Sequence, residues 1–164
     1  MKPEHPSHLQ PEPTDTSVAL ERRLRANTRG EVLFDMASRG RYATDASIYQ
    51  VMPVGVFVPT DDADVRTAIQ IARELKVPVL PRGAGTSQCG QTVGACLVID
   101  GSKHLRNVLT LDVQRRTARV QPGLVLDHLN AQLKSHGLWF PVDVSTSDKA
   151  TVGRMAGNKS CGSR

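Results

Sequence analysis

A short apolar run, an amphipathic segment and a second short apolar run follow one another in the first half of the chain, and this order restricts the fold most. Residues 54–58 and 77–80 have the length and composition of buried strands. The apolar side chains between them recur at helical spacing: Val65, Ala68, Ile69, Ala72 and Leu75. Thr60 and Asp61 can cap the start of that helix. The pattern predicts a parallel βαβ unit, with a third strand at 95–100.

Two helices are expected before this unit. Residues 17–26 place Leu20 and Leu24 on one face of a helix. Residues 31–38 are expected to form a second helix, because Thr28 and Glu31 have the spacing of a capping box. The segment 17–41 is therefore predicted to be helical.

The pattern changes after residue 100. Residues 108–112 and 117–121 alternate apolar and polar side chains, which predicts an antiparallel hairpin. Helical spacing returns at Leu126, Leu129 and Leu133, and Gly137 stands where a helix commonly ends. Residues 141–164 are rich in turn formers, and no further strand or helix is expected there. The fold class is therefore α+β: a βαβ lobe plus the start of a second, mixed or antiparallel lobe that is incomplete at its C-terminal end.

Composition excludes several classes of protein. The chain has 164 residues, 39% of them apolar, enough to bury a core without disulfides. The longest nearly apolar stretch, residues 51–58, is too short to span a membrane. The formal net charge of +5 permits weak attraction to nucleic acid, but aromatic residues are only 4%, so no stacking platform for bases is expected. Nucleic acid is therefore not an expected partner.

The cysteines and the N-terminal residues indicate an intracellular protein. Three Cys without CxxC spacing are neither a disulfide framework nor a zinc site, and no metal site is expected. Residues 1–16 are polar, contain four Pro and lack the apolar core of a signal peptide. They are expected to form a disordered tail, and the protein is expected in the reducing cytoplasm.

The glycine-rich loop 82–94 is the most informative stretch for chemistry. Gly83, Gly85 and Gly90 allow backbone N–H groups to approach an anion closely, and Thr86 and Ser87 add hydroxyl groups. The loop matches neither a Walker motif nor a Rossmann fingerprint. Phosphate binding and an ordinary glycine-rich turn both remain open from the pattern alone.

A second cluster of small and polar residues occupies 151–163. It offers the same chemistry as the first loop, so two such loops could hold the two ends of one dinucleotide. Taken alone, the cluster is more typical of a flexible linker.

At these two loops the sequence resembles the FAD-binding domain of the vanillyl-alcohol oxidase/PCMH-type flavoproteins, in particular the FAD-linked D-lactate dehydrogenases and the glycolate oxidase flavoprotein subunit. The matching residues are collinear: 42–49, Pro53, Pro59, 72–74, 77–87, 90–91, 120–123 and 141–164. The resemblance implies an N-terminal fragment with a PCMH-type FAD-binding domain over 42–164.

The resemblance also implies the cofactor and its site. FAD is expected to be held without a covalent bond, because the loop 82–87 contains no His. The cofactor-binding residues it implies are Arg82, Gly83, Ala84, Gly85, Thr86, Ser87, Gly90, Gln91, Ser147, Thr151, Gly153, Asn158, Ser160 and Gly162. Arg82 could instead hold the loop by structural hydrogen bonds, and the residue type does not decide between the two roles.

The activity that the resemblance implies is oxidation of a D-2-hydroxy acid such as D-lactate or glycolate by hydride transfer to flavin. Electrons would then pass to an iron–sulfur, quinone or cytochrome acceptor. The catalytic and substrate-binding residues of such enzymes lie in later segments, so none is assigned in this chain. A flavoenzyme of the same fold with another substrate, or a non-catalytic remnant that no longer binds FAD, remains an alternative.

Two residues depart from the family pattern. Arg154 stands where a second consecutive Gly is usual, and Lys159 where Asn is common. A long cation could clash with a close backbone approach or meet a phosphate; local damage to the site is the expectation.

Other residues that could carry chemistry are given structural roles. Trp139 and Phe140 are expected in the core rather than stacked on flavin. The histidines 104, 128 and 136 are expected at the surface or at helix ends, and Cys89 is expected to be inert.

Overall fold

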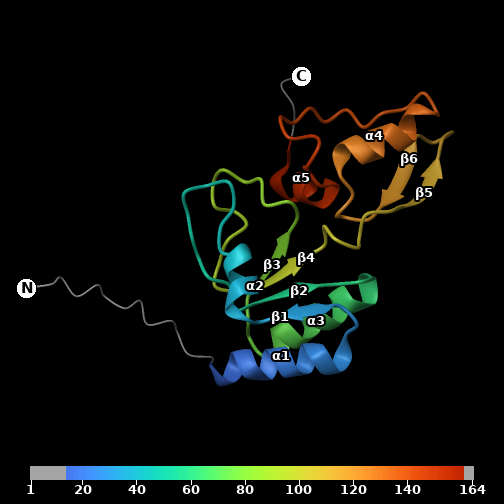
Figure 1. Cartoon of the computed structure of the whole chain (residues 1–164). Coiled ribbons are helices and arrows are strands. Elements are labelled where there is room, and N and C mark those ends of the chain that lie inside the picture. The colour runs from blue at the N-terminus through green and yellow to red at the C-terminus, as the bar shows by residue number, and fades with distance from the viewer. Residues whose placement is uncertain (1–13, 161–164) are drawn as a thin grey trace, which may run out of the picture.

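The computed structural model describes residues 14–160, which form two lobes joined by the segment after residue 100 (Figure 1). The elements of the first lobe are α1 (Asp15–Asn27), β1 (Glu31–Leu33), α2 (Met36–Arg41), β2 (Gly55–Val58), α3 (Asp62–Glu74), β3 (Val79–Arg82) and β4 (Leu97–Asp100). Its four strands form one sheet in the order β1-β2-β4-β3. Strands β2, β4 and β3 are parallel, and β1 pairs antiparallel with β2 at the edge. The predicted βαβ unit and third strand are therefore present.

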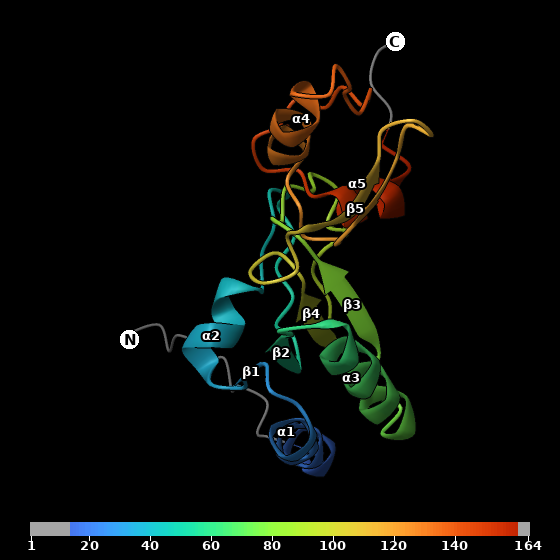
Figure 2. The ribbon, with the colours of Figure 1, turned by 90° about the vertical axis from the view of Figure 1, so that its right-hand side faces the viewer.

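Helices cover both faces of this sheet. The buried side chains of α1 and α3, among them Leu20 and Ile71, pack with Phe57 and Leu97 of the sheet. Figure 2 shows these two helices side by side below the sheet and α2 on the other side of the strands. The α3 helix begins at the predicted cap, since the Asp61 carboxylate accepts from the amide of Asp64. The two central strands, β2 and β4, are thus buried on both faces, as their apolar runs require.

The second lobe contains the hairpin of β5 (Val108–Asp112) and β6 (Thr117–Val120), followed by α4 (Leu126–Lys134) and α5 (Val152–Asn158). The predicted hairpin and helix are confirmed. Leu129 and Leu133 of α4 pack against the hairpin, and Gly137, with φ of +67°, lies just beyond the helix. Figure 1 shows α5 between the two lobes, next to the end of β3.

The predicted start of the second helix and its predicted cap were both wrong. Residues 31–33 form strand β1, and the helix begins only at Met36, capped by Asp35. Thr28 caps no second helix, because its hydroxyl donates to the Leu24 carbonyl at the end of α1. Of the expected tail, residues 1–13 lie outside the described part of the chain, and residues 15 and 16 already belong to α1.

Two predictions for the C-terminal part were also wrong. Residues 152–158 form a helix where none was expected, because Met155 packs into a small core with Leu126 and Ala150. Trp139 and Phe140 are not core residues, since they are 57% and 38% exposed. They line an apolar groove of the second lobe instead.

Among residues 14–160 there is no helix that is long and apolar enough to cross a membrane. The same residues bring no three His, Cys, Asp or Glu side chains together as a metal site.

Candidate functional site

The two glycine-containing segments of the sequence meet between the lobes. A Cβ atom on Gly83 would overlap the hydroxyl of Thr151, so the first loop packs directly on the second. A cavity of about 190 Å³ opens at this contact. Its lining comes from both lobes: Pro59, Val65, Pro81, Arg82, Gly83, Ile99, Gly101, Leu105, Pro122, Gly123, Thr151, Gly153, Arg154 and Gly157.

Backbone hydrogen bonds hold the start of α5 against residues 122–125. The amide of Val152 donates to the Leu124 carbonyl (2.9 Å), and the amide of Gly153 donates to the Pro122 carbonyl (2.8 Å). A Cβ on Gly153 would lie 2.5 Å from the Cβ of Pro122. Only glycine permits this approach, so the position of α5 depends on residue 153.

Gly123 and Gly101 belong to the cavity although neither was among the predicted site residues. A Cβ on Gly123 would overlap the backbone carbonyl of Gly101, and the Gly123 amide donates to the Leu105 carbonyl (2.8 Å). The dipeptide Pro122-Gly123 was the available signal, because it is a typical turn sequence between two predicted elements.

The loop after β3 presents backbone donors without protein acceptors. In the described part of the chain, the amides of residues 84–88 donate to no protein group. Gly85 and Gly90 have φ of +71° and +70°, values that favour glycine. Consecutive amide groups in such a loop form an anion-binding concavity. The free amides of this loop can therefore donate hydrogen bonds to phosphate or carboxylate oxygens.

Arg82 holds this loop rather than leaving its guanidinium free. Its two terminal nitrogens donate to the carbonyls of Tyr42 (3.0 Å), Thr92 (2.9 Å) and Thr44 (2.8 Å). Its guanidinium carbon also lies 5.2 Å from the centre of the Tyr42 ring. Burial lowers the pKa of Arg82, and the carboxylate of Asp100 opposes this. These hydrogen bonds give Arg82 a structural role in the loop, and the same side chain lines the cavity.

Asp45 and Asp100 fix segments next to the loop: Asp45 bonds Thr92, and Asp100 bonds Tyr42, whose carbonyl accepts from Arg82. The Asp45 carboxylate accepts from the amide of Ser47 (2.9 Å) and the hydroxyl of Thr92 (2.9 Å). Burial raises the pKa of Asp45, but the hydrogen bonds from Ser47 and Thr92 outweigh it and lower the pKa to about 2. Asp100 accepts from the Tyr42 hydroxyl (2.7 Å), and burial with this bond raises the pKa of Tyr42.

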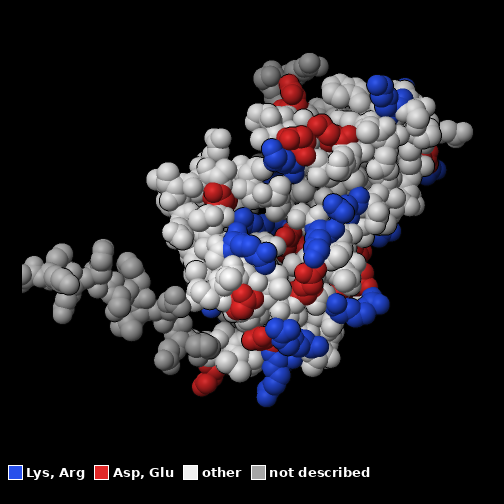
Figure 3. All heavy atoms as spheres, viewed as in Figure 1, with Lys and Arg blue, Asp and Glu red and all other residues white. Residues whose placement is uncertain are grey.

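Arg154 reaches from α5 across to the first loop. One terminal nitrogen donates to the side-chain oxygen of Gln91 (2.8 Å), and the side chain lines the cavity. Burial lowers its pKa, and the charge of Asp45 opposes this. Figure 3 shows Lys and Arg side chains gathered across the middle of one face, with Asp and Glu among them.

The structure brings only some of the predicted site residues to the cavity. Arg82, Gly83, Thr151 and Gly153 line it, whereas residues 84–91 continue the same loop without lining the cavity. Ser147 lies in the turn before α5, where its carbonyl accepts from the amide of Asp127, and it does not line the cavity. Asn158 is exposed at the end of α5, and Ser160 bonds back to Met155. Gly162 lies outside the described residues.

Comparison of the sequence with known proteins assigns the chain to one family. The sequence model of the family described as "FAD binding domain" matches residues 53–164. A D-2-hydroxyglutarate dehydrogenase of Pseudomonas putida is 41% identical over 146 residues, which cover 87% of this chain and 14% of that protein. The glycolate oxidase subunit of Bacillus subtilis is 35% identical over 138 residues, covering 80% of this chain and 29% of that protein. The chain thus spans less than a third of the length of these relatives.

Solved structures share the fold. An alkyldihydroxyacetonephosphate synthase superposes with a TM-score of 0.81 at 20% identity, over 94% of this chain and 31% of that one. The xylooligosaccharide oxidase of Myceliophthora thermophila gives a TM-score of 0.66 at 23% identity, over 82% and 29% of the two chains. At these identities the likeness concerns the fold alone.

Proposed function

Since the chain belongs to the family of FAD binding domains, we propose that it is the FAD-binding portion of an oxidoreductase that oxidises a D-2-hydroxy acid. FAD is the cofactor of this family. With its diphosphate at the cavity between the lobes, FAD would supply the acceptor for the hydride. The chain's own residues hold and orient the dinucleotide.

The cavity between the glycine segments is the single observation that carries the proposal. Its walls include Gly83, Gly123 and Gly153, whose missing side chains let the surrounding segments pack closely around the cavity. The neighbouring amides of residues 84–88 supply donors for the oxygens of a diphosphate. These features fit the phosphate-bearing part of a dinucleotide.

We assign the binding residues by the part of the site that each can serve. The diphosphate would be held by amides and hydroxyls of the first loop, and the rest of the dinucleotide would lie along the second. The proposed set is Gly83, Ala84, Gly85, Thr86, Ser87, Gly90, Gln91, Ser147, Thr151, Gly153, Asn158, Ser160 and Gly162, with Arg82 supporting the loop. The attachment is non-covalent, because residues 82–87 contain no His.

Titration of the chain with FAD tests the cofactor assignment. Flavin fluorescence is expected to change saturably, and denaturation followed by filtration is expected to release all of the flavin. No change on titration contradicts the binding proposal. Flavin that stays with the denatured chain contradicts the non-covalent attachment.

The names of the relatives support the substrate class. They include D-2-hydroxyglutarate dehydrogenase, a glycolate oxidase subunit and a D-lactate dehydrogenase named as acting with cytochrome. We therefore propose a small 2-hydroxy acid as substrate and a cytochrome, quinone or iron–sulfur centre as electron acceptor. The free thiols of Cys89 and Cys96 support a reducing, cytoplasmic location.

The substrate class is tested on the protein that carries this domain. Anaerobic addition of a D-2-hydroxy acid is expected to bleach the flavin absorbance. The L enantiomer is expected to leave that absorbance unchanged. Bleaching by a sugar or a simple alcohol, with none by hydroxy acids, would contradict this substrate class and leave the FAD assignment intact.

A further inference from the structure

Arg154 is a half-buried cation with one hydrogen bond, to a neutral acceptor. Its side chain lines the cavity, and its one hydrogen bond goes to the Gln91 side-chain oxygen. Its Nε atom is fully buried and has no hydrogen-bond partner among residues 14–160. A buried donor without an acceptor is unfavourable by about 1–3 kcal/mol, and more for a charged group.

No carboxylate forms an ion pair with Arg154 within the described ranges. Asp45 is the acidic group whose charge acts on it, but that carboxylate is already bonded to Ser47 and Thr92. The half-buried guanidinium therefore has no anionic partner within residues 14–160.

The side chain of Gln91 is a weak hold on this cation. Gln91 is an exposed residue, and its side-chain oxygen is also 3.4 Å from the Ser87 hydroxyl. A neutral amide forms weaker bonds with guanidinium than a phosphate, which can accept two parallel N–H donors. An anion entering the cavity would therefore compete successfully for Arg154.

We propose that Arg154 is a phosphate-binding residue of this cavity, exchanging the Gln91 side chain for a phosphate oxygen of the bound dinucleotide. This inference rests on the proposed function. It replaces the expectation that a long cation at this position damages the site. The amides of residues 84–88 lie in the same loop that Arg154 reaches, so the side chain and the loop would bind one anion from two sides.

The test compares ligands that differ in phosphate. Wild-type chain, Arg154→Ala and Arg154→Lys are titrated with FAD, ADP and riboflavin, with binding followed by calorimetry. Arg154→Ala is expected to weaken FAD and ADP binding roughly tenfold, the equivalent of one charged hydrogen bond. Riboflavin, which has no phosphate, is expected to bind unchanged. Arg154→Lys keeps the charge without the planar fork and is expected to fall between the two.

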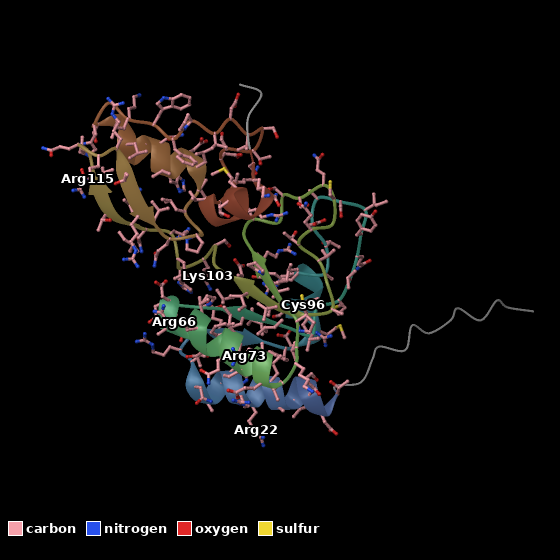
Figure 4. The ribbon with its side chains drawn as sticks, turned by 180° about the vertical axis from the view of Figure 1, so that it is seen from behind. Arg22, Arg66, Arg73, Cys96, Lys103 and Arg115 are labelled. Carbon is pink, nitrogen blue, oxygen red and sulfur yellow. The ribbon has the colours of Figure 1, made fainter. Side chains whose placement is uncertain are left out.

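Arg115→Ala is the matched control, because it removes the same charge from the chain. Arg115 lies at the turn of the hairpin, with its side chain 84% exposed, far from α5 (Figure 4). Its affinities are expected to equal those of the wild type. Salt is expected to weaken ADP binding to the wild type and Arg115→Ala more steeply than to Arg154→Ala.

The outcomes separate this inference from the proposed function. ADP binding by Arg154→Ala that equals or exceeds the wild type overturns the inference, and tighter binding would make Arg154 an obstruction in the pocket. If Arg154→Ala does not fold, as judged by circular dichroism, Arg154→Lys decides, and an affinity for ADP equal to or above that of the wild type overturns the inference. A wild-type chain that binds none of the three ligands contradicts the proposed function, and the inference falls with it.

Discussion

At the scale of single residues, the site depends on positions where a side chain is missing. Gly83, Gly123 and Gly153 each sit where a Cβ would run into another segment. Gly83 would meet Thr151, and Gly123 would meet the backbone of Gly101. The two lobes can therefore approach closely enough to share one cavity only because these residues are glycine.

Gly83→Ala is expected to destabilise the chain by about 1–3 kcal/mol, as overpacking of a tight contact does. FAD affinity is expected to fall as well, because the two loops would be forced apart. Urea unfolding and FAD titration measure the two effects. Gly40→Ala is the control, because a Cβ there meets nothing within 4 Å and alanine favours the helix. Equal stability of the two variants would contradict the contact at Gly83.

Asp45 is expected to make the chain less stable in acid. Its pKa is about 2 when folded, against about 3.9 in an unfolded chain, so the unfolded state binds more protons between these values. The stability that Asp45 contributes is fully present above about pH 4 and is lost as the pH falls toward 2. Asp45→Asn is expected to lower stability at pH 7 and to reduce the loss between pH 4 and 2.

Urea unfolding at a series of pH values measures this effect. Asp148→Asn serves as control, because that carboxylate is 63% exposed and its ion pair is with the neighbouring Lys149. A stability profile of Asp45→Asn that runs parallel to that of the wild type would show that Asp45 does not carry the acid sensitivity.

At the scale of elements, the sequence predicts the helices and strands whose apolar periodicity lies within their own residues. The βαβ unit and α4 have clear apolar periodicity, and the structure contains them. Strand β1 has only three residues, and it is a strand because it pairs with β2, more than twenty residues along the chain. Helix α5 contains two Gly within seven residues and is stabilised by contacts with residues 122–125. Elements such as β1 and α5, which depend on partners distant in the sequence, show no periodic pattern in their own residues.

In the candidate site, too, features within one segment could be predicted from the sequence, and those that depend on distant residues could not. The glycine loop 83–91 could be recognised from its composition, but the role of Arg82 depends on carbonyls of residues 42, 44 and 92. Trp139 and Phe140 were expected in the core rather than stacked on flavin. Their exposure follows from their place at the edge of a groove rather than beneath it.

The two sheets are expected to differ in local stability. Strand β4 is buried and paired on both sides, whereas the β5–β6 hairpin has only two strands and mostly exposed side chains. Two-stranded ribbons are marginal on their own. Hydrogen exchange of residues 97–99 is therefore expected to be slower than that of 108–120. Equal protection would show that the lobes open together.

At the scale of the whole molecule, the positive charge is only partly available to a partner. Three of the arginines near the N-terminus, Arg23, Arg25 and Arg29, pair with Glu74, Glu21 and Asp61. These pairs offset half of the six arginines in residues 20–41. On the face drawn in Figure 3, Lys and Arg side chains are interspersed with Asp and Glu.

The chain is therefore expected to bind duplex DNA only at low ionic strength. At about 150 mM salt, where charges are screened beyond roughly 8 Å, the chain is expected to leave the fluorescence anisotropy of a labelled short duplex unchanged. Fluorescence anisotropy across a salt series measures this. Micromolar binding that persists at that salt concentration would contradict it.

The exposed groove of the second lobe gives the molecule a built-in optical reporter. Trp139 is the single tryptophan of the chain, and it stands at the rim of that groove, 57% exposed. Its emission therefore comes from the second lobe alone, while most of the helical signal in circular dichroism comes from α1 and α3 of the first. Following both signals through one denaturation separates the melting of the two lobes without any label.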